Sequence, residues 1–285
     1  MDLVKLLYFI LVVTNAGGEG KTLIAKLIQA IWEIGGIDAV ILDGDVGNYS
    51  SKSTDETAKV VGWGVKPQVA PEIVASTINQ HAIMDLGANA MASAREVADL
   101  VPALEEHYRK DERRCIAFLP VSTNKSGAVG AINTLEEKVA YFDKYVVKVD
   151  RDLSGNFDGD VSSQQVLELA YLAPGFQMLI AQCGGSIAKA ICQPPEGYKL
   201  ASTYLAKWAY DFVSQDGMPD IFDGAILNKL RSYSDIPGEL RELVLHLDDA
   251  TDAALEENVK KSRIIEVIDQ CGWTPEGLRS AANKI

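Results

Sequence analysis

The sequence has little cysteine and little histidine. Its four cysteines and three histidines are scattered through 285 residues, and no two cysteines form a Cys-x-x-Cys pair. A structural zinc site or a disulfide framework needs such residues at short, regular spacings, so we exclude both and expect a reducing, cytoplasmic environment. Glycine and proline, with 23 and 10 residues, are too few for a collagen-like or low-complexity chain.

Positive charge is also in short supply. The chain has 27 Lys and Arg against 40 Asp and Glu, which gives a net charge of −13. Such a chain lacks the broad electrostatic surface that binds DNA, RNA or anionic lipid, so we expect direct nucleic-acid binding to be weak or absent. The densest basic group, residues 109–114, is interrupted by Asp111 and Glu112 and indicates a solvated helix end.

The apolar run near the start of the chain is short. Leu6–Val13 is nearly all apolar, but a membrane-spanning helix needs about 20 such residues. No small-residue cleavage site of a signal peptide follows the run. We therefore expect no transmembrane segment, and we predict that this run is a buried parallel strand.

Short apolar runs alternate with helical stretches along most of the chain, the pattern of an α/β fold. We predict a doubly wound, mostly parallel sheet with helices on both faces over residues 1–216. Residues 217–285 show no clear strand and are predicted to form a helical C-terminal extension. The predicted strands are Leu6–Val13, Ala39–Leu42, Ala82–Met84 with its flanks, Cys115–Leu119, Tyr145–Val149 and, as a sixth candidate, Phe176–Ile180. The predicted helices are Thr22–Ile34, Ser93–Asp111, Val129–Phe142 and Ser202–Gln215.

A glycine-rich loop joins the first predicted strand to the first predicted helix. The residues of this predicted binding site are Gly17, Gly18, Glu19, Gly20, Lys21, Thr22 and Leu23. Only glycine lets a backbone approach a phosphate chain closely in the conformations that aim several amides at it. Lys21 would supply a cation for the β- and γ-phosphates, and the Thr22 hydroxyl a magnesium ligand. We expect the Lys21 side chain to be solvated in the absence of a ligand.

Carboxylates follow the next two buried strands of the predicted sheet. Asp43 and Asp45 end the second strand, and Asp85 ends the third. The carboxyl ends of parallel strands meet at one edge of the sheet, so these side chains are predicted to share the edge that carries the glycine-rich loop. Carboxylates are suitable groups for binding a metal and for orienting a water.

Together, these motifs resemble the deviant Walker-A ATPases typified by ParA and MinD, of the SIMIBI class of P-loop NTPases. The resemblance covers about residues 5–215 and is strongest up to residue 90. It implies that Asp45 positions the attacking water, that Thr22 and Asp43 belong to the magnesium shell, and that Asp85 takes the Walker-B role. It also implies catalysis by Asp45 with Lys21, and ATP and Mg²⁺ as the cofactors.

The sequence departs from that family at two positions in the loop. The signature lysine, which in the family reaches across a nucleotide-bridged dimer, falls at Ala16 here. An acidic residue, Glu19, lies inside the loop and would make the anion site less positive. Both departures predict very slow basal hydrolysis and a need for a cation from elsewhere in this chain or from a partner.

The base-binding residues are less clearly marked. Residues 124–127 begin like the guanine-reading motif Asn-Lys-x-Asp, but Gly127 stands where the carboxylate should be. In the family the adenine contacts follow the fifth strand, which places them at Asp150 and Arg151 here. The choice of ATP over GTP rests on the resemblance.

We expect from these motifs an Mg-dependent ATP-binding protein with slow ATPase activity. The resemblance implies a nucleotide switch in plasmid partition, conjugation or intracellular positioning. It would bind ATP and ADP, act on a protein partner such as an adaptor or activator, and form a nucleotide-dependent homodimer. Two alternatives remain open: a regulatory module that binds nucleotide without hydrolysing it, and an ATP-dependent ligase similar to dethiobiotin synthetase.

Overall fold

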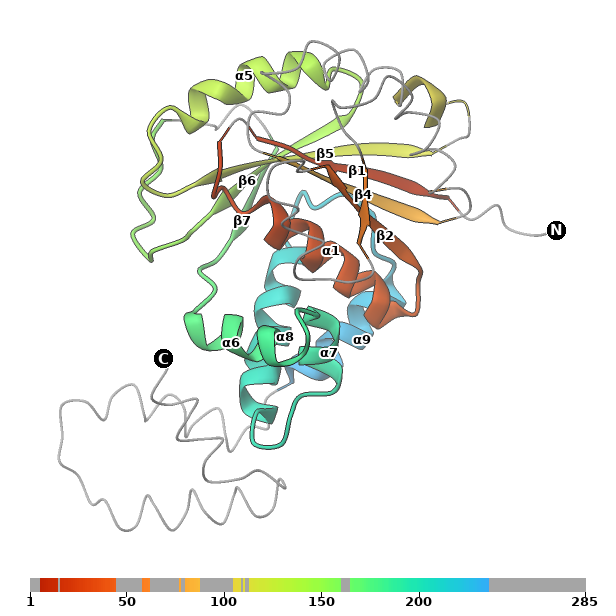
Figure 1. Ribbon diagram of the computed structural model, residues 1–285, viewed down its shortest axis with the longest axis vertical. Helices are drawn as coiled ribbons and strands as arrows, with labels where there is room; N and C mark the ends of the chain where they lie inside the picture. Colours follow the sequence, from red (N-terminus) through yellow and green to blue (C-terminus); the bar gives the residue numbers. More distant parts are fainter. Residues whose placement is uncertain are drawn as a thin grey trace. The chain divides into compact units, whose positions relative to one another are not determined.

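The computed structural model describes nine parts of the chain, which Figure 1 draws as coloured ribbon. They are residues 6–14, 16–44, 58–61, 77, 80–87, 105–108, 110, 113–159 and 165–235. Of the predicted site residues, Asp45 lies outside these ranges. Most of the predicted helix 93–111 and of the predicted C-terminal extension also lies outside them.

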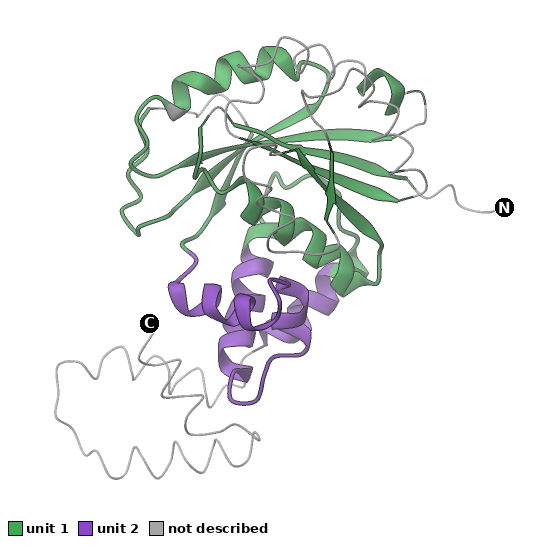
Figure 2. Cartoon of the chain, viewed as in Figure 1, with its two compact units in different colours: residues 1–171, 212–226 green, residues 172–211, 227–285 purple. Residues whose placement is uncertain are grey.

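The chain divides into two compact units, coloured separately in Figure 2. The first contains residues 1–171 and 212–226, and the second contains residues 172–211 and 227–285. The predicted division into domains at residues 216 and 217 stays a prediction, because residues 236–285 are not described.

The first unit is built on a seven-stranded, wholly parallel sheet with the strand order β3-β2-β4-β1-β5-β6-β7. Helices cover both faces of this sheet, with α1 on one face and α5 on the other (Figure 1). The predicted fold class, a doubly wound α/β sheet, is therefore confirmed. The strands are β1 Tyr8–Val12, β2 Ala39–Gly44, β3 Lys59–Val60, β4 His81–Leu86, β5 Arg114–Ser122, β6 Asp143–Val149 and β7 Val166–Leu169. The described helices are α1 Lys21–Gly35, α5 Ala128–Lys138, α6 Pro174–Gln182, α7 Ile187–Cys192, α8 Lys199–Val213 and α9 Gly224–Ser234.

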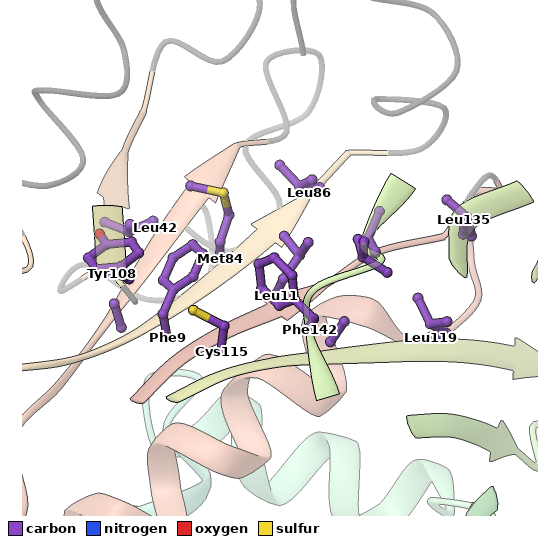
Figure 3. Packing of buried hydrophobic residues seen from close by; sticks show 14 of the residues in the cluster. Phe9, Leu11, Leu42, Met84, Leu86, Tyr108, Cys115, Leu119, Leu135 and Phe142 are labelled. Atoms are coloured by element: carbon purple, nitrogen blue, oxygen red, sulfur yellow. The ribbon is translucent and has the colours of Figure 1, made fainter. Parts of the chain in front are cut away.

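The central strands bury both of their faces, which explains why they are apolar at nearly every position. Alternate side chains of the central strands enter one cluster beneath α5, where Phe9 and Leu11 of β1 lie beside Met84 of β4, and Phe9 also lies beside Cys115 of β5 (Figure 3). Leu135 of α5 packs into the same cluster. This core fixes the register of the strands, because a slip by one residue would exchange the two buried faces.

Helix α1 is buried along most of its length, as its apolar sequence predicts. Ile24, Ile28 and Trp32 are fully buried. The helix ends at Gly36, which has a left-handed conformation (φ 78°) and donates its N–H to the Glu33 carbonyl at 2.9 Å. Glycine takes this conformation without the steric cost that other residues incur, so Gly36 sets where the helix stops.

The sequence assigned one strand wrongly and missed two others, the two-residue β3 and the strand β7. Phe176–Ile180 is not a strand but part of helix α6. Pro174 occupies the first turn of that helix, where the missing proline N–H costs no hydrogen bond. The last strand of the sheet is instead β7, four residues long and interrupted by the exposed Glu168. Helix α8 was predicted in nearly the right place.

The second unit contains α6, α7 and most of α8. The Ser186 hydroxyl caps α7 by accepting the Lys189 N–H at 3.1 Å. The buried Ser202 hydroxyl of α8 donates to the Ile191 carbonyl at the end of α7, at 2.8 Å. In the part of the chain that the structure describes, every helix is too short or too polar to cross a lipid bilayer.

Candidate functional site

The candidate site lies where the order of the strands reverses direction. From β1 the chain passes to β2 on one side of the sheet, and from β5 it passes to β6 on the other side. Because β1 and β5 are neighbours, the loops that follow them diverge from one point at the carboxyl edge. Open α/β sheets bind their ligands at such a point.

The loop after β1 needs glycine at two of its positions. Gly18 and Gly20 have left-handed backbones, with φ of 76° and 88°. A Cβ on Gly20 would lie 3.1 Å from a methyl carbon of Val149, and a Cβ on Gly18 would lie 3.0 Å from the Arg151 guanidinium. The glycines therefore meet both a conformational and a steric requirement, as the motif predicted.

Helix α1 begins at the end of this loop with an open N-terminus. Its N-cap is Gly20, no side chain accepts a capping hydrogen bond there, and the first turn contains no acidic residue. The first N–H groups of a helix have no partner within it and carry a partial positive charge. An anion is the natural partner for them, and Gly17 and Gly18 leave the loop exposed to solvent on its outer side.

Lys21, the first residue of α1, is buried rather than solvated, contrary to our expectation. Only 9% of it is exposed, and its Nζ donates to the carbonyl of Ala16 at 3.0 Å. The long apolar stem packs inside while the ammonium turns back over the loop. The cation is thus already held at the start of the glycine-rich loop, and substitution of Lys21 will also remove buried packing.

Two predicted metal ligands are in direct contact. The Thr22 hydroxyl donates to Oδ2 of Asp85 at 2.7 Å, across 63 residues of sequence. Asp43 pairs with Asp85 in the register of β2 and β4, and both carboxylates are almost fully buried. The sheet therefore gathers Thr22, Asp43 and Asp85 at one edge. The position predicted to orient the water, Asp45, is outside the described residues.

This donor set fits a hard cation that is shared with a bound anion. Among the described residues, no three His, Cys, Asp or Glu side chains are grouped to hold a metal by themselves. Mg²⁺ is usually bound through one or two carboxylates and takes its other ligands from phosphate and water. Thr22 and Asp85 would hold Mg²⁺ beside a phosphate chain that rests on the amides of the loop.

Glu19 turns away from the anion site and into the protein. It is 1% exposed, and its Oε2 accepts the backbone N–H of Ser122 at 2.6 Å. Within the described residues its Oε1 has no hydrogen-bond partner. A buried acceptor without a partner lowers the free energy of unfolding by about 1–3 kcal/mol. The bond from Ser122 to the other oxygen of Glu19 offsets part of this penalty. The acidic side chain ties the loop to the end of β5.

Two further cations reach the outer side of the loop. Lys125 Nζ donates to the Gly17 carbonyl at 2.9 Å, and Arg151 Nη1 donates to the Gly18 carbonyl at 2.5 Å. With Lys21 on Ala16, three successive carbonyls of the loop each accept a hydrogen bond from a different cation. Arg151 was predicted to lie near the base, and Lys125 was not predicted to contact the loop.

The loops that carry Lys125 and Arg151 are bonded to each other. Asn124, which has a left-handed backbone (φ 55°), donates its side-chain amide to Asp152 and to Ser154. Its carbonyl oxygen accepts the side-chain amide of Asn156 at 3.0 Å. Both Asn124 side-chain donors are thus in use, so Asn124 has none left to read a guanine.

The Asp152 carboxylate accepts several of the hydrogen bonds in this network. Hydrogen bonds from Ser154, then from Asn124 and Thr123, hold the pKa of the Asp152 carboxyl well below its usual value. Each of these bonds stabilises the ionised form. The ionised Asp152 carboxylate thus bonds the side chain of Asn124, the neighbour of Lys125, to the loop that contains Ser154.

The remaining predicted site residues lie at the edges of the site. Asp150 follows β6, where its N–H donates to the Leu169 carbonyl at 2.9 Å and its Oδ1 accepts the Asp152 N–H at 3.3 Å. Leu23 is half-buried in the first turn of α1. The base-contacting role of Asp150 and Arg151 stays a prediction.

Comparison with known proteins gives only loose matches. No protein-family model matches the sequence, and no curated protein sequence matches it. Among solved structures, the chain is similar to the MinD cell division protein of Aquifex aeolicus, with 12% identity, a TM-score of 0.40, and coverage of 81% of this chain and 98% of that one.

Two FtsY chains also match. The chloroplast FtsY of Physcomitrella patens has 12% identity and a TM-score of 0.39, over 50% of this chain and 49% of that one. FtsY of Elizabethkingia anophelis, in complex with GDP, has 16% identity and a TM-score of 0.38, over 55% and 52%. The match spans about half the length of each FtsY chain. At these TM-scores the likeness is too loose to transfer a function, and the fold class rests on the strand order described above.

Proposed function

We propose that this protein binds ATP with Mg²⁺ at the loop after β1 and hydrolyses it slowly. The observation that carries the proposal is the bond between Thr22 and Asp85, because it places two hard oxygen ligands beside the open N-terminus of α1. A turn that merely capped the helix would need neither the Thr22–Asp85 pair nor a lysine held over the loop. Nucleotide binding accounts for the Thr22–Asp85 pair, for the open N-terminus of α1 and for the position of Lys21.

The chain's own residues would divide the work as follows. The amides of residues 17–22 would receive the phosphate oxygens, and Lys21 would move from the Ala16 carbonyl to the nearby negative charge. Thr22, Asp43 and Asp85 would hold Mg²⁺, which neutralises phosphate charge when bound. By the resemblance to the ParA and MinD family, Asp45 would orient the attacking water.

We propose ATP rather than GTP as the nucleotide. Asn124 is the residue with which a guanine-reading motif would begin, and both of its side-chain donors are bonded to Asp152 and Ser154. Asp150 and Arg151, at the end of the neighbouring strand β6, are then the groups proposed to contact the base. Arg151 already reaches the loop through Gly18.

The proposed biological role is that of a nucleotide switch that acts on a protein partner. Plasmid partition, conjugation and intracellular positioning are the settings that the family resemblance implies, with a cytoplasmic location and a nucleotide-dependent homodimer. The alternative of a binding module that scarcely hydrolyses is favoured by one observation. Residue 16 is alanine and offers no cation to a second subunit.

Titration calorimetry tests the proposal. Because the Lys21 stem is buried, we compare Lys21→Met, which keeps an apolar stem, with Lys21→Ala and with Lys26→Ala as a charge control on the same helix. Loss of a charged hydrogen bond, about 1.5–3 kcal/mol, should weaken Mg-ATP binding by roughly 10- to 100-fold or more. Binding by a folded Lys21→Met protein at wild-type affinity, or tighter binding of Mg-GTP than of Mg-ATP by the wild type, would contradict the corresponding part of the proposal.

A further inference from the structure

Lys125 reaches the candidate site from a strand other than the one that carries the motif. It lies in the loop after β5, and its Nζ donates to the carbonyl of Gly17 at 2.9 Å, across 108 residues of sequence. Strand β5 is the direct neighbour of β1 on the side where the strand order reverses. Lys125 therefore lies at the same edge of the sheet as the glycine-rich loop.

The position of Lys125 is set by the backbone around it. The Thr123 N–H donates to the Val149 carbonyl at 3.2 Å, the Asn124 N–H donates to the Asn156 carbonyl at 2.9 Å, and the Gly127 N–H donates to the Asp158 carboxylate at 2.8 Å. The strand that leads into this loop is itself fastened to the glycine-rich loop through Ser122 and Glu19. Two separate bonds, Glu19 with Ser122 and Lys125 with Gly17, thus join the two loops.

The Gly17 carbonyl, which accepts the Lys125 hydrogen bond, carries no charge that would neutralise the Lys125 ammonium. Within the described residues its contact is a neutral carbonyl, and it forms no ion pair with a carboxylate. Lys21 donates to the carbonyl of the preceding residue, Ala16, so the two lysines bind neighbouring carbonyls of one loop. The charged groups of a phosphate chain are stronger acceptors than the carbonyls that they would replace.

We propose that Lys125 is a second phosphate-binding cation, supplied by the same chain at a loop where residue 16 has no charge. The inference rests on the proposed function and deepens it, because it names the group that compensates for Ala16. Lys125 acts on the phosphate part of the nucleotide rather than on the base, and its contribution therefore grows with the number of phosphates.

The test measures the affinities of the full-length protein for Mg-ATP, Mg-ADP and AMP by competition with a fluorescent nucleotide. The variants are Lys125→Ala, Lys125→Arg and Lys138→Ala, which removes the same charge at the far end of α5. Lys125→Ala should weaken ATP binding roughly 10-fold or more and AMP binding much less. Lys125→Arg should restore most of the loss, and Lys138→Ala should behave as wild type. Removal of the contact should also make ATP binding less sensitive to salt.

Three results would overturn the inference. An equal loss of ATP and AMP affinity in Lys125→Ala, with a lowered melting temperature in the absence of nucleotide, would show that Lys125 only ties the loops together. Unchanged affinity for every nucleotide would show that Lys125 has no role in binding. Lys21→Met separates this failure from that of the proposed function: if it loses ATP while Lys125→Ala does not, only the inference is wrong. If neither variant changes binding, or if the wild type binds no ATP, both are wrong.

Discussion

Substitution of Gly20 by alanine should destabilise the protein through two additive effects that the structure separates. The left-handed backbone at Gly20 costs an alanine about 1–2 kcal/mol. The new Cβ would also lie 3.1 Å and 3.3 Å from the two methyl carbons of Val149, and overpacking of this kind typically costs about 1–3 kcal/mol. We expect Gly20→Ala to lower the free energy of unfolding by about 2–5 kcal/mol, the sum of these two ranges.

Gly36 provides a matched control at the other end of the same helix. Its φ of 78° is close to the 88° of Gly20, but a Cβ there would meet no atom within 4 Å. Gly36→Ala should therefore show only the backbone cost. The change in the unfolded chain is the same for both substitutions and cancels in the comparison.

Urea denaturation followed by circular dichroism measures the difference between the two variants. Gly20→Ala should be less stable than Gly36→Ala by the packing cost. The double variant Gly20→Ala/Val149→Ala should recover part of that cost as a coupling energy of about 0.5–3 kcal/mol. If the two single variants are equally stable, Gly20 is not packed against β6, and our account of the loop is wrong.

Three other predictions concern hydrolysis and pH. Asp45→Ala should slow hydrolysis by at least roughly 10²-fold while ATP binding changes far less. A fall in turnover only in proportion to occupancy would make Asp45 a turn residue. Wild-type turnover per molecule should be very slow and independent of protein concentration, whereas Ala16→Lys should make it rise with concentration; brisk, concentration-dependent hydrolysis by the wild type alone would refute this interpretation of Ala16. The lowered pKa of Asp152 predicts that its contribution to stability is complete above the usual Asp pKa and is lost only as pH falls through the lower folded value. A carboxyl-carbon NMR titration with its midpoint at the usual Asp value would contradict that.

The elements that sequence predicts well are those whose signals are local. The first strand and α1 were found because a fully apolar run, a glycine-rich turn and Gly36 mark their ends within a few residues. The error at Phe176–Ile180 has the opposite cause. A short apolar run fits a buried strand or a helix equally well, and period alone does not separate them. Strand β7 has only four residues, and its exposed Glu168 breaks the apolar run.

The candidate site shows the same division. Thr22 and Asp85 were predicted because each belongs to a motif at the end of a strand, and the structure brings them together. The contacts of Lys125 with Gly17 and of Glu19 with Ser122 span more than 100 residues. They depend on β5 lying beside β1, and a motif search along one sequence does not supply that strand order. Lys125 was noticed only as part of an incomplete guanine-reading motif.

A crystal structure of the full-length protein with Mg²⁺ and a non-hydrolysable ATP analogue tests the central claim most directly. We predict that the phosphates lie on the amides of residues 17–22, that Lys21 and Lys125 contact phosphate oxygens, and that Mg²⁺ lies next to Thr22 with Asp85 beside it. A nucleotide bound away from the loop after β1, or a loop left empty at saturating analogue and Mg²⁺, would contradict the account.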